Sequence, residues 1–146
     1  MRKLFTFLMI VTAMFFSGLM MWGSYYIFAP PWLTYEGAIR VLVPSVRPGQ
    51  AVPIRVTRCN IRGERGEYDV DRWLVPTSGT PGVVVTLQPS LGISIEPGCR
   101  TDDAALSVIP EKTVPGRYFI TGTARLRSAL IFNTVYWATE PFEVTP

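Results

Sequence analysis

Residues 4–28 form an unbroken apolar run that follows Arg2 and Lys3 and contains no charged side chain. As a helix rising about 1.5 Å per residue, the run reaches roughly 37 Å, which is enough to cross a hydrocarbon core of about 30 Å. The alternative is a buried helix of a soluble protein, but soluble helices that are apolar on every side are rare. We therefore predict a transmembrane helix over residues 4–28.

A cleaved signal peptide is another reading of an N-terminal apolar segment. Its apolar core would span about 7 to 15 residues and end in small residues at a cleavage site. Here the run is longer, and it ends in Trp22, Tyr25, Tyr26 and Phe28 before two prolines. The sequence favours an uncleaved signal-anchor helix.

The flanks of the run predict its orientation. Cations beside a span are retained in the cytoplasm, and residues 29–35 on the far side carry none. Residues 1–3 are then a cytoplasmic tail, and the C-terminal part of the chain is periplasmic or extracellular. The rings of Trp22 and Trp32 would mark the outer interface, because amphipathic rings prefer the headgroup layer.

The residues after the span are nearly neutral as a group. The formal net charge of the chain is +3, and it falls to +1 when Arg2 and Lys3 are set aside. A neutral domain does not attract polyanions, so we expect no nucleic-acid partner. About 115 residues follow the span, which is the size of one domain. We expect a linker over residues 29–37 and a single domain over 38–146.

Cys59 and Cys99 are the two cysteines of the chain, which has no histidine. Compartments outside the cytoplasm are oxidising, so we predict a disulfide. Its loop of about 41 residues would contribute roughly 4 kcal/mol to stability. The alternative is a pair of reduced thiols that bind a metal, but two cysteines do not complete a zinc or copper ligand set. We expect neither a metal nor another cofactor.

Beyond residue 31 the apolar pattern has a period of two, and proline or glycine interrupts it every eight to twelve residues. This pattern is typical of an all-β sandwich or barrel. The predicted strands are 38–43, 51–59, 68–75, 83–87, 93–95, 104–109, 117–127 and 134–144.

The clearest of these strands, 117–127, has Tyr118 and Ile120 on its core face. Its entry, PGRYFI from Pro115, resembles that of the penultimate strand of immunoglobulin-like and fibronectin-like domains, where a tyrosine bonds back to the preceding turn. The resemblance covers the residues after the span. It implies an antiparallel β-sandwich, the corner role for Tyr118, and a buried position for Trp73. An antibody-type domain has its second cysteine at the position of Ile120, so here the disulfide is expected to be peripheral.

Acidic side chains gather in one predicted strand, where Glu67, Asp69 and Asp71 share a face. Carboxylates so grouped could bind calcium or, with an oppositely tuned acid, catalyse hydrolysis. The alternative is a solvated face interleaved with arginines such as Arg72. The chain lacks an Asp-rich calcium loop, so we favour the solvated face. A second acidic pair, Asp102-Asp103, is expected in a turn.

Nothing else in the sequence predicts catalysis. A serine nucleophile would need a lysine or carboxylate base, and Lys3 and Lys112 fall in the tail and in a loop. A Gly-rich phosphate loop is also missing from the sequence. We therefore expect no catalytic residue and no enzyme.

Leu130, Ile131 and Phe132 lie between the last two predicted strands, where a hairpin would normally turn through polar residues. Exposed apolar residues at a turn fit a contact with a partner or a bilayer, with Arg125 and Arg127 as a polar rim. The alternative is that the strands run longer and half of these residues face the core.

One span with a short tail builds neither a pore nor a cytoplasmic site. We therefore predict a non-enzymatic structural or interaction protein that displays an immunoglobulin-like module outside a membrane and contacts another protein. Ala13, Ser17 and Gly18 would let a second helix approach the span closely. A virus- or phage-encoded anchor that joins a membrane to a shell fits the same pattern. A calcium- or glycan-binding module is the alternative of a different class.

Overall fold

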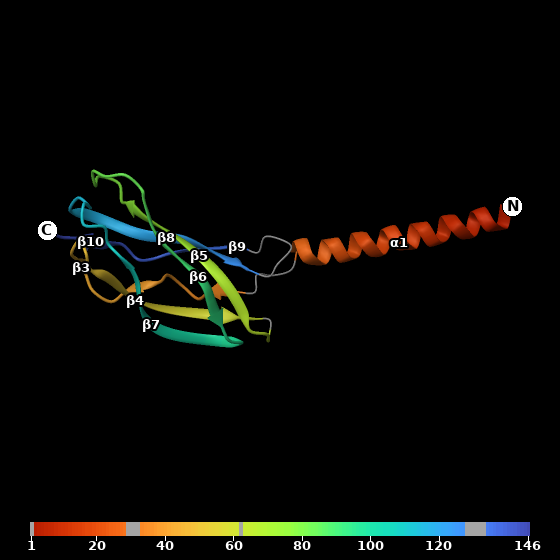
Figure 1. The fold of residues 1–146 in the computed structure, drawn as a ribbon, viewed down its shortest axis with the longest axis horizontal. Coiled ribbons are helices and arrows are strands. Elements are labelled where there is room, and N and C mark those ends of the chain that lie inside the picture. Colours follow the sequence, from red (N-terminus) through yellow and green to blue (C-terminus); the bar gives the residue numbers. More distant parts are fainter. Residues whose placement is uncertain (1, 29–32, 62, 128–133) are drawn as a thin grey trace. The chain divides into compact units, whose positions relative to one another are not determined.

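The computed structural model describes residues 2–28, 33–61, 63–127 and 134–146 (Figure 1). The chain divides into two compact units, Met1–Pro30 and Pro31–Pro146. The first unit is helical and the second consists of β-strands. The expected combination of an N-terminal helix and an all-β domain is confirmed.

The helical unit is a single α-helix, α1 (Arg2–Phe28). Between Thr6 and Ser24 it is long and apolar enough to cross a membrane, and large side chains such as Phe7 and Met21 are exposed in this unit. Phe, Met and Leu are the commonest residues of the segment, and they place no polar group in competition with the helical backbone. The predicted span therefore forms a helix, and none of its window Thr6–Ser24 is buried.

The first sheet of the β unit is built around one long central strand. It contains β1 (Leu33–Tyr35), β2 (Arg40–Val41), β4 (Ala51–Asn60) and β7 (Gly98–Val108). The other three strands all pair with β4 in antiparallel register. Because β1 and β2 share one side of β4, β7 takes the other side.

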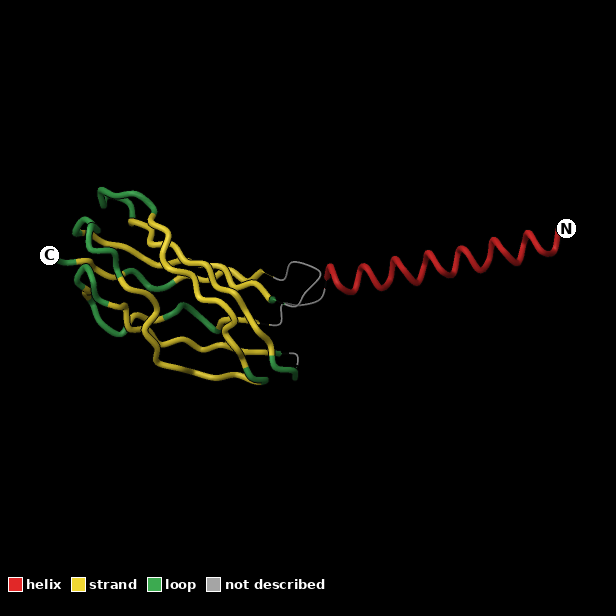
Figure 2. Tube along the Cα trace, viewed as in Figure 1, coloured by secondary structure: helices red, strands yellow, loops and turns green. Residues whose placement is uncertain are grey.

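The second sheet runs in the order β3-β10-β8-β5-β6, and β9 also pairs with β8. Figure 2 shows the strands of the β unit in yellow and the helix in red. Its strands are β3 (Ser45–Val46), β5 (Gly66–Pro76), β6 (Val85–Ile95), β8 (Gly116–Leu126), β9 (Thr134–Ala138) and β10 (Phe142–Val144). All of these pairs are antiparallel except β3 with β10, which is parallel.

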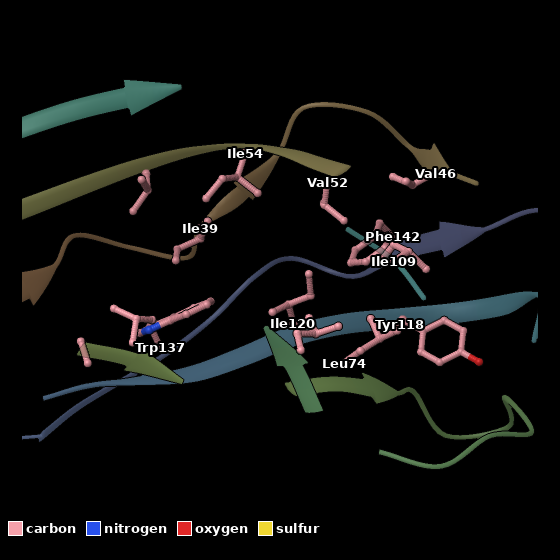
Figure 3. Packing of buried hydrophobic residues seen from close by; sticks show 14 of the residues in the cluster. Ile39, Val46, Val52, Ile54, Leu74, Ile109, Tyr118, Ile120, Trp137 and Phe142 are labelled. Atoms are coloured by element: carbon pink, nitrogen blue, oxygen red, sulfur yellow. The ribbon is translucent and has the colours of Figure 1, made fainter. Parts of the chain in front are cut away.

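One hydrophobic core lies between the two sheets (Figure 3). Val52 and Ile54 of β4 face Leu74, Tyr118 and Ile120 of the second sheet, and all five side chains are buried. Alternate residues of a strand point to opposite faces, which explains why these positions are two apart in the sequence. The predicted core face of the strand that contains Tyr118 is confirmed.

The tryptophan of this core is Trp137, not Trp73. Trp137 is 7% exposed and packs over Gly122, where an added Cβ would lie 2.4 Å from the indole ring. Glycine at position 122 therefore provides the space for the ring. Trp73 immediately precedes the buried Leu74, so strand alternation points its side chain to the outer face of β5, where it is partly exposed. The buried position implied for Trp73 is wrong.

Several predicted element boundaries differ from the structure. β1 begins inside the predicted linker, and Leu33 is fully buried, so the β unit starts before residue 38. The predicted strands 83–87 and 93–95 are parts of one strand, β6, and the predicted strand 134–144 is interrupted between β9 and β10. β7 begins at Gly98, which places Asp102 and Asp103 in a strand rather than a turn.

Among the described residues, β6 pairs with β5 alone and β7 pairs with β4 alone. Each of these strands has 11 residues and therefore leaves a long edge of the β unit unpaired. The two strands are consecutive in the chain but belong to different sheets.

Candidate functional site

A cavity of about 260 Å³ lies between the two sheets and is lined by both free-edge strands. From β6 it takes Ser90, Ile93 and Ile95, and from β7 it takes Ala104, Ala105 and Leu106. Ala104 and Ala105 are exposed, so the wall that β7 contributes is in contact with solvent. Half of the remaining wall residues are aliphatic side chains of the core, and the other half are aromatic residues and arginines.

Arg72 is the charged residue at the inner wall of this cavity. It is 8% exposed and shares the inward face of β5 with Val70 and Leu74. Its Nη2 donates to Ser90 Oγ at 2.7 Å, and its Nη1 donates to Gln88 O at 3.3 Å and Ser107 Oγ at 3.4 Å. The prediction that Arg72 belongs to a solvated face is wrong, because its position in the strand alternation turns it inward.

The guanidinium of Arg72 has no ion-pair partner among the residues that the structure describes. Its Nε is buried and has no hydrogen-bond acceptor there either. Burial lowers the pKa of Arg72, and the nearby Tyr35 opposes this effect. The cavity wall therefore holds a buried cation whose hydrogen-bond acceptors are neutral hydroxyl and carbonyl groups.

Two further donors line the same cavity. Burial raises the pKa of Tyr35 to about 12, against the opposing effects of Arg58 and Arg72, so this phenol is protonated at neutral pH. The Trp137 ring lies 6.0 Å from the Tyr35 ring, and its Nε1 is buried without an acceptor in the described part of the chain. The cavity is thus rich in donors.

Arg58 also lines the cavity but already has a counter-ion. Its Nη2 lies 2.7 Å from Asp102 Oδ2, and Asp102 also pairs with Arg100 at 2.7 Å. No carboxylate, thiol or lysine is among the described lining residues. The cavity offers a cation, neutral donors and apolar walls, and it lacks a nucleophile-and-base pair of the usual kinds.

The predicted disulfide between Cys59 and Cys99 is present. The two cysteines are directly opposite each other on β4 and β7, with their Cα atoms 4.0 Å apart. The bond therefore joins neighbouring strands of one sheet and does not cross the core. The carboxylate of Glu36 lies beside the two sulfur atoms, but sulfur atoms in a disulfide are not available as thiolate ligands.

The acidic strand pairs with arginines of its neighbour. Arg125 forms an ion pair with Asp71, and Arg127 lies 3.7 Å from Asp69 and 4.0 Å from Glu67. Asp69 Oδ1 also accepts the Gly92 amide at 2.9 Å. These carboxylates are engaged with protein donors on an outer face. This arrangement agrees with the solvated face favoured from the sequence, and it gives no support to a calcium site.

The proposed contact residues Leu130, Ile131 and Phe132 lie outside the described residues. Their predicted rim, Arg125 and Arg127, is on β8 and just beyond it, where both side chains face the acidic residues of β5. The contact surface stays a prediction.

A second hollow lies on the outer face of the second sheet. It is shallow, and its aromatic residues are Trp73 and Tyr136, the latter 78% exposed. Thr121, Thr123 and Arg125 add polar groups beside the rings. Alternation within β9 could have indicated this site, because a buried Trp137 requires its neighbour Tyr136 to face outward.

No family model and no curated protein matches this sequence. Among solved structures, it is similar to the alkylpurine DNA glycosylase AlkC of Pseudomonas fluorescens bound to DNA containing an abasic site analog, with a TM-score of 0.48 and 15% identity over 80% of this chain and 31% of that chain. It is also similar to Spo0M, a sporulation control protein of Bacillus subtilis, with a TM-score of 0.44 and 13% identity over 76% of this chain and 51% of that chain.

The superoxide reductase (neelaredoxin) of Ignicoccus hospitalis gives a TM-score of 0.33 and 12% identity over 77% of this chain and 80% of that chain. This chain thus spans less than two thirds of the first two structures. Likenesses this distant indicate no function.

Proposed function

We propose that this chain is a single-pass membrane protein without enzymatic activity that displays an immunoglobulin-like module on the outer side of a membrane, where it binds another protein. The observation that carries this proposal is that β6 and β7, with 11 residues each, have one edge that pairs with no other described strand. Unpaired strand edges present rows of N–H and C=O groups that a strand of a partner can complete.

The strand order supports the immunoglobulin-like assignment. In that fold, strands B and E share one sheet and strands C, F and G share the other. Here β4 and β7 take the places of B and E, and β5, β8 and β10 take those of C, F and G. The corner tyrosine adds support, because Tyr118 Oη donates to Val114 O at 2.8 Å. The disulfide within one sheet departs from the antibody pattern.

The apolar helix α1 supports the membrane anchor. Exposed apolar side chains surround it, and a bilayer is the solvent that such a surface requires. The cations Arg2 and Lys3 favour a cytoplasmic N-terminus. The small residues Ala13, Ser17 and Gly18 remain candidates for helix–helix association, and an added Cβ at Gly18 would meet no atom within 4 Å.

Two apolar side chains on the free edges give a test of partner binding. Leu91 on β6 is 68% exposed and Val108 on β7 is 58% exposed. A lysine on an edge strand opposes the addition of another strand. The experiment is crosslinking and purification of the full chain from its native membrane, as wild type and as Leu91→Lys, Val108→Lys and Val114→Lys. Val114 is similarly exposed but lies in the loop before β8, so it serves as the matched control.

We expect one crosslinked protein to be recovered with wild type and with Val114→Lys, and to be lost with at least one edge variant. All four proteins should have thermal midpoints in a narrow range, because surface substitutions usually change stability by about 0.5 kcal/mol or less. Equal recovery with both edge variants would contradict binding through these edges.

A glycan-binding module is a second candidate, favoured by the outer-face hollow with Trp73 and Tyr136. Aromatic rings beside hydroxyl groups can stack on the apolar face of a sugar ring. Tryptophan fluorescence of the full chain during titration with oligosaccharides tests this idea. Saturable changes that disappear in Tyr136→Ala would support it, and a flat response over a broad glycan set would remove it.

A further inference from the structure

We infer that the cavity between the two sheets binds a small apolar carboxylate, whose charged group pairs with Arg72. The cavity shares strands β6 and β7 with the edges to which we assign partner binding, but its lining does not include Leu91 or Val108, on which that proposal is tested. It is defined by the inward-facing cation, the open donors beside it and the aliphatic walls. Its ligand is a free carboxylic acid in its anionic form, not a segment of a protein.

Burial of Arg72 without a counter-ion is the first observation. An ionised group taken out of water is costly unless it is paired, and the described groups that contact this guanidinium are two hydroxyls and one carbonyl. Arg58, on the wall of the same cavity, is paired with Asp102 and so needs no further anion. A bound carboxylate would supply the negative charge that no described residue places beside Arg72.

The open hydrogen-bond donors are the second observation. The Nε of Arg72 is buried without an acceptor in the described residues, and Nε with Nη2 forms the edge of a guanidinium that binds a carboxylate through two parallel bonds. The Nε1 of Trp137 is also buried without an acceptor in that part of the chain. Both residues line this cavity, but the two donor atoms have almost no accessible surface, so an acceptor-only ligand would reach them after a small shift of these side chains.

The size and the walls of the cavity specify the rest of the ligand. A cavity of about 150 Å³ holds benzene, so the volume of about 260 Å³ accommodates roughly ten non-hydrogen atoms. Ile54, Val56, Ile93 and Leu106 make these walls apolar. A small inorganic anion would leave them wet, whereas an aliphatic tail would cover them. Octanoate has the required charge and size.

The experiment measures octanoate binding to the full chain in lipid nanodiscs by isothermal calorimetry and by tryptophan fluorescence, with empty nanodiscs subtracted. Octanamide and octylammonium are the neutral and cationic counterparts of the probe. The protein variants are Arg72→Met, Arg72→Lys and Arg55→Met. Arg55 is the matched control, because it is an exposed arginine paired with Asp103 at 2.7 Å outside the cavity.

We expect saturable octanoate binding to wild type and Arg55→Met, and affinity at least about tenfold lower for octanamide and octylammonium, because a charge-assisted pair is lost. Arg72→Met should lose octanoate binding by a similar factor, and Arg72→Lys should retain part of it. Octanoate binding that survives in Arg72→Met, or equal binding of octanamide, would overturn the inference, as would a signal that matches empty nanodiscs.

Circular dichroism and thermal melting show whether Arg72→Met is folded. If that variant does not fold, the comparison of octanoate with octanamide on wild type decides, together with Arg72→Lys. Failure of this test leaves the partner-binding proposal intact, because that proposal is tested on Leu91 and Val108, which do not line the cavity.

Discussion

Tyr118 joins the core to the turn before β8 through a single polar atom. Its ring is buried between the sheets, and its hydroxyl donates to Val114 O at 2.8 Å. In Tyr118→Phe the ring stays and the carbonyl loses its donor. We expect the free energy of unfolding to fall by about 1 to 3 kcal/mol, measured by urea denaturation.

Tyr136→Phe is the control for this substitution. The Tyr136 side chain is 78% exposed, so water hydrogen-bonds its hydroxyl in both the folded and the unfolded protein. Its effect should stay within about 0.5 kcal/mol. If Tyr118→Phe leaves the urea midpoint as unchanged as the control does, the hydroxyl has no corner role.

Individual side chains also show where sequence reasoning succeeds and where it stops. The alternation of β8 predicted the inward direction of Tyr118 and Ile120, because large apolar residues recur there at every second position. The same alternation places Arg72 with Val70 and Leu74, but its charge argued for solvent. Strand geometry decided the direction of Arg72, and hydrogen bonds to β6 and β7 made its burial possible.

The disulfide adds a covalent link to the backbone pairing and the ion pairs that join β4 to β7. A loop of about 41 residues contributes roughly 4 kcal/mol when it is closed, because closure restricts the unfolded chain. We expect the double variant Cys59→Ala, Cys99→Ala to lose free energy of unfolding of this order in a denaturant titration. Reduction should lower the midpoint of wild type to that of the variant and leave the variant unchanged. Two alkylatable thiols in folded, non-reduced protein would contradict this prediction.

Arginine–aspartate pairs across β4 and β7 make the β unit sensitive to acid. Hydrogen bonds from Arg58 lower the pKa of Asp102, and those from Arg55 lower the pKa of Asp103. A carboxyl group whose folded pKa is lowered stabilises the fold above its unfolded pKa of about 3.9, and this contribution is lost as pH falls through the folded pKa.

We therefore expect the thermal midpoint of wild type to decrease as the pH is lowered from about 5 to about 2. The decrease should be smaller in the double variant Asp102→Asn, Asp103→Asn. Glu111→Gln, an exposed residue of the turn after β7, is the control and should keep the wild-type slope. Identical slopes in all three proteins would show that these pairs do not contribute.

The predicted strands differ from the observed ones for identifiable reasons. Pro89 lies between the predicted strands 83–87 and 93–95, but β6 continues through it, because β6 is an edge strand where a missing N–H disturbs no second neighbour. The first half of β7, from Gly98 to Asp103, is polar and mostly exposed, so it carries no alternation signal. Pairing with β4, which the sequence cannot display, defines that half as a strand.

The division into an apolar helix and a β unit could be predicted almost completely, because composition and period change together after the span. The cavity could not, since it depends on how far β6 and β7 diverge and on side chains from many separate strands. The length and apolarity of the helix predict that it spans a membrane, but they do not predict its orientation. The predicted orientation therefore depends on the flanking cations Arg2 and Lys3.

We predict that protease added to the outer side of intact cells digests the β unit and leaves a membrane-embedded fragment that contains α1, because cations before a span keep the N-terminus in the cytoplasm. The mature protein should still contain Arg2 and Lys3, because the anchor is not cleaved. In Arg2→Gln, Lys3→Gln the protected fraction should rise, since this retention signal is removed. The Cys59–Cys99 bond gives an independent readout, because it forms in oxidising compartments. A protected, reduced β unit in wild type would reverse the orientation, and a mature N-terminus between residues 25 and 31 would turn the anchor into a cleaved signal peptide.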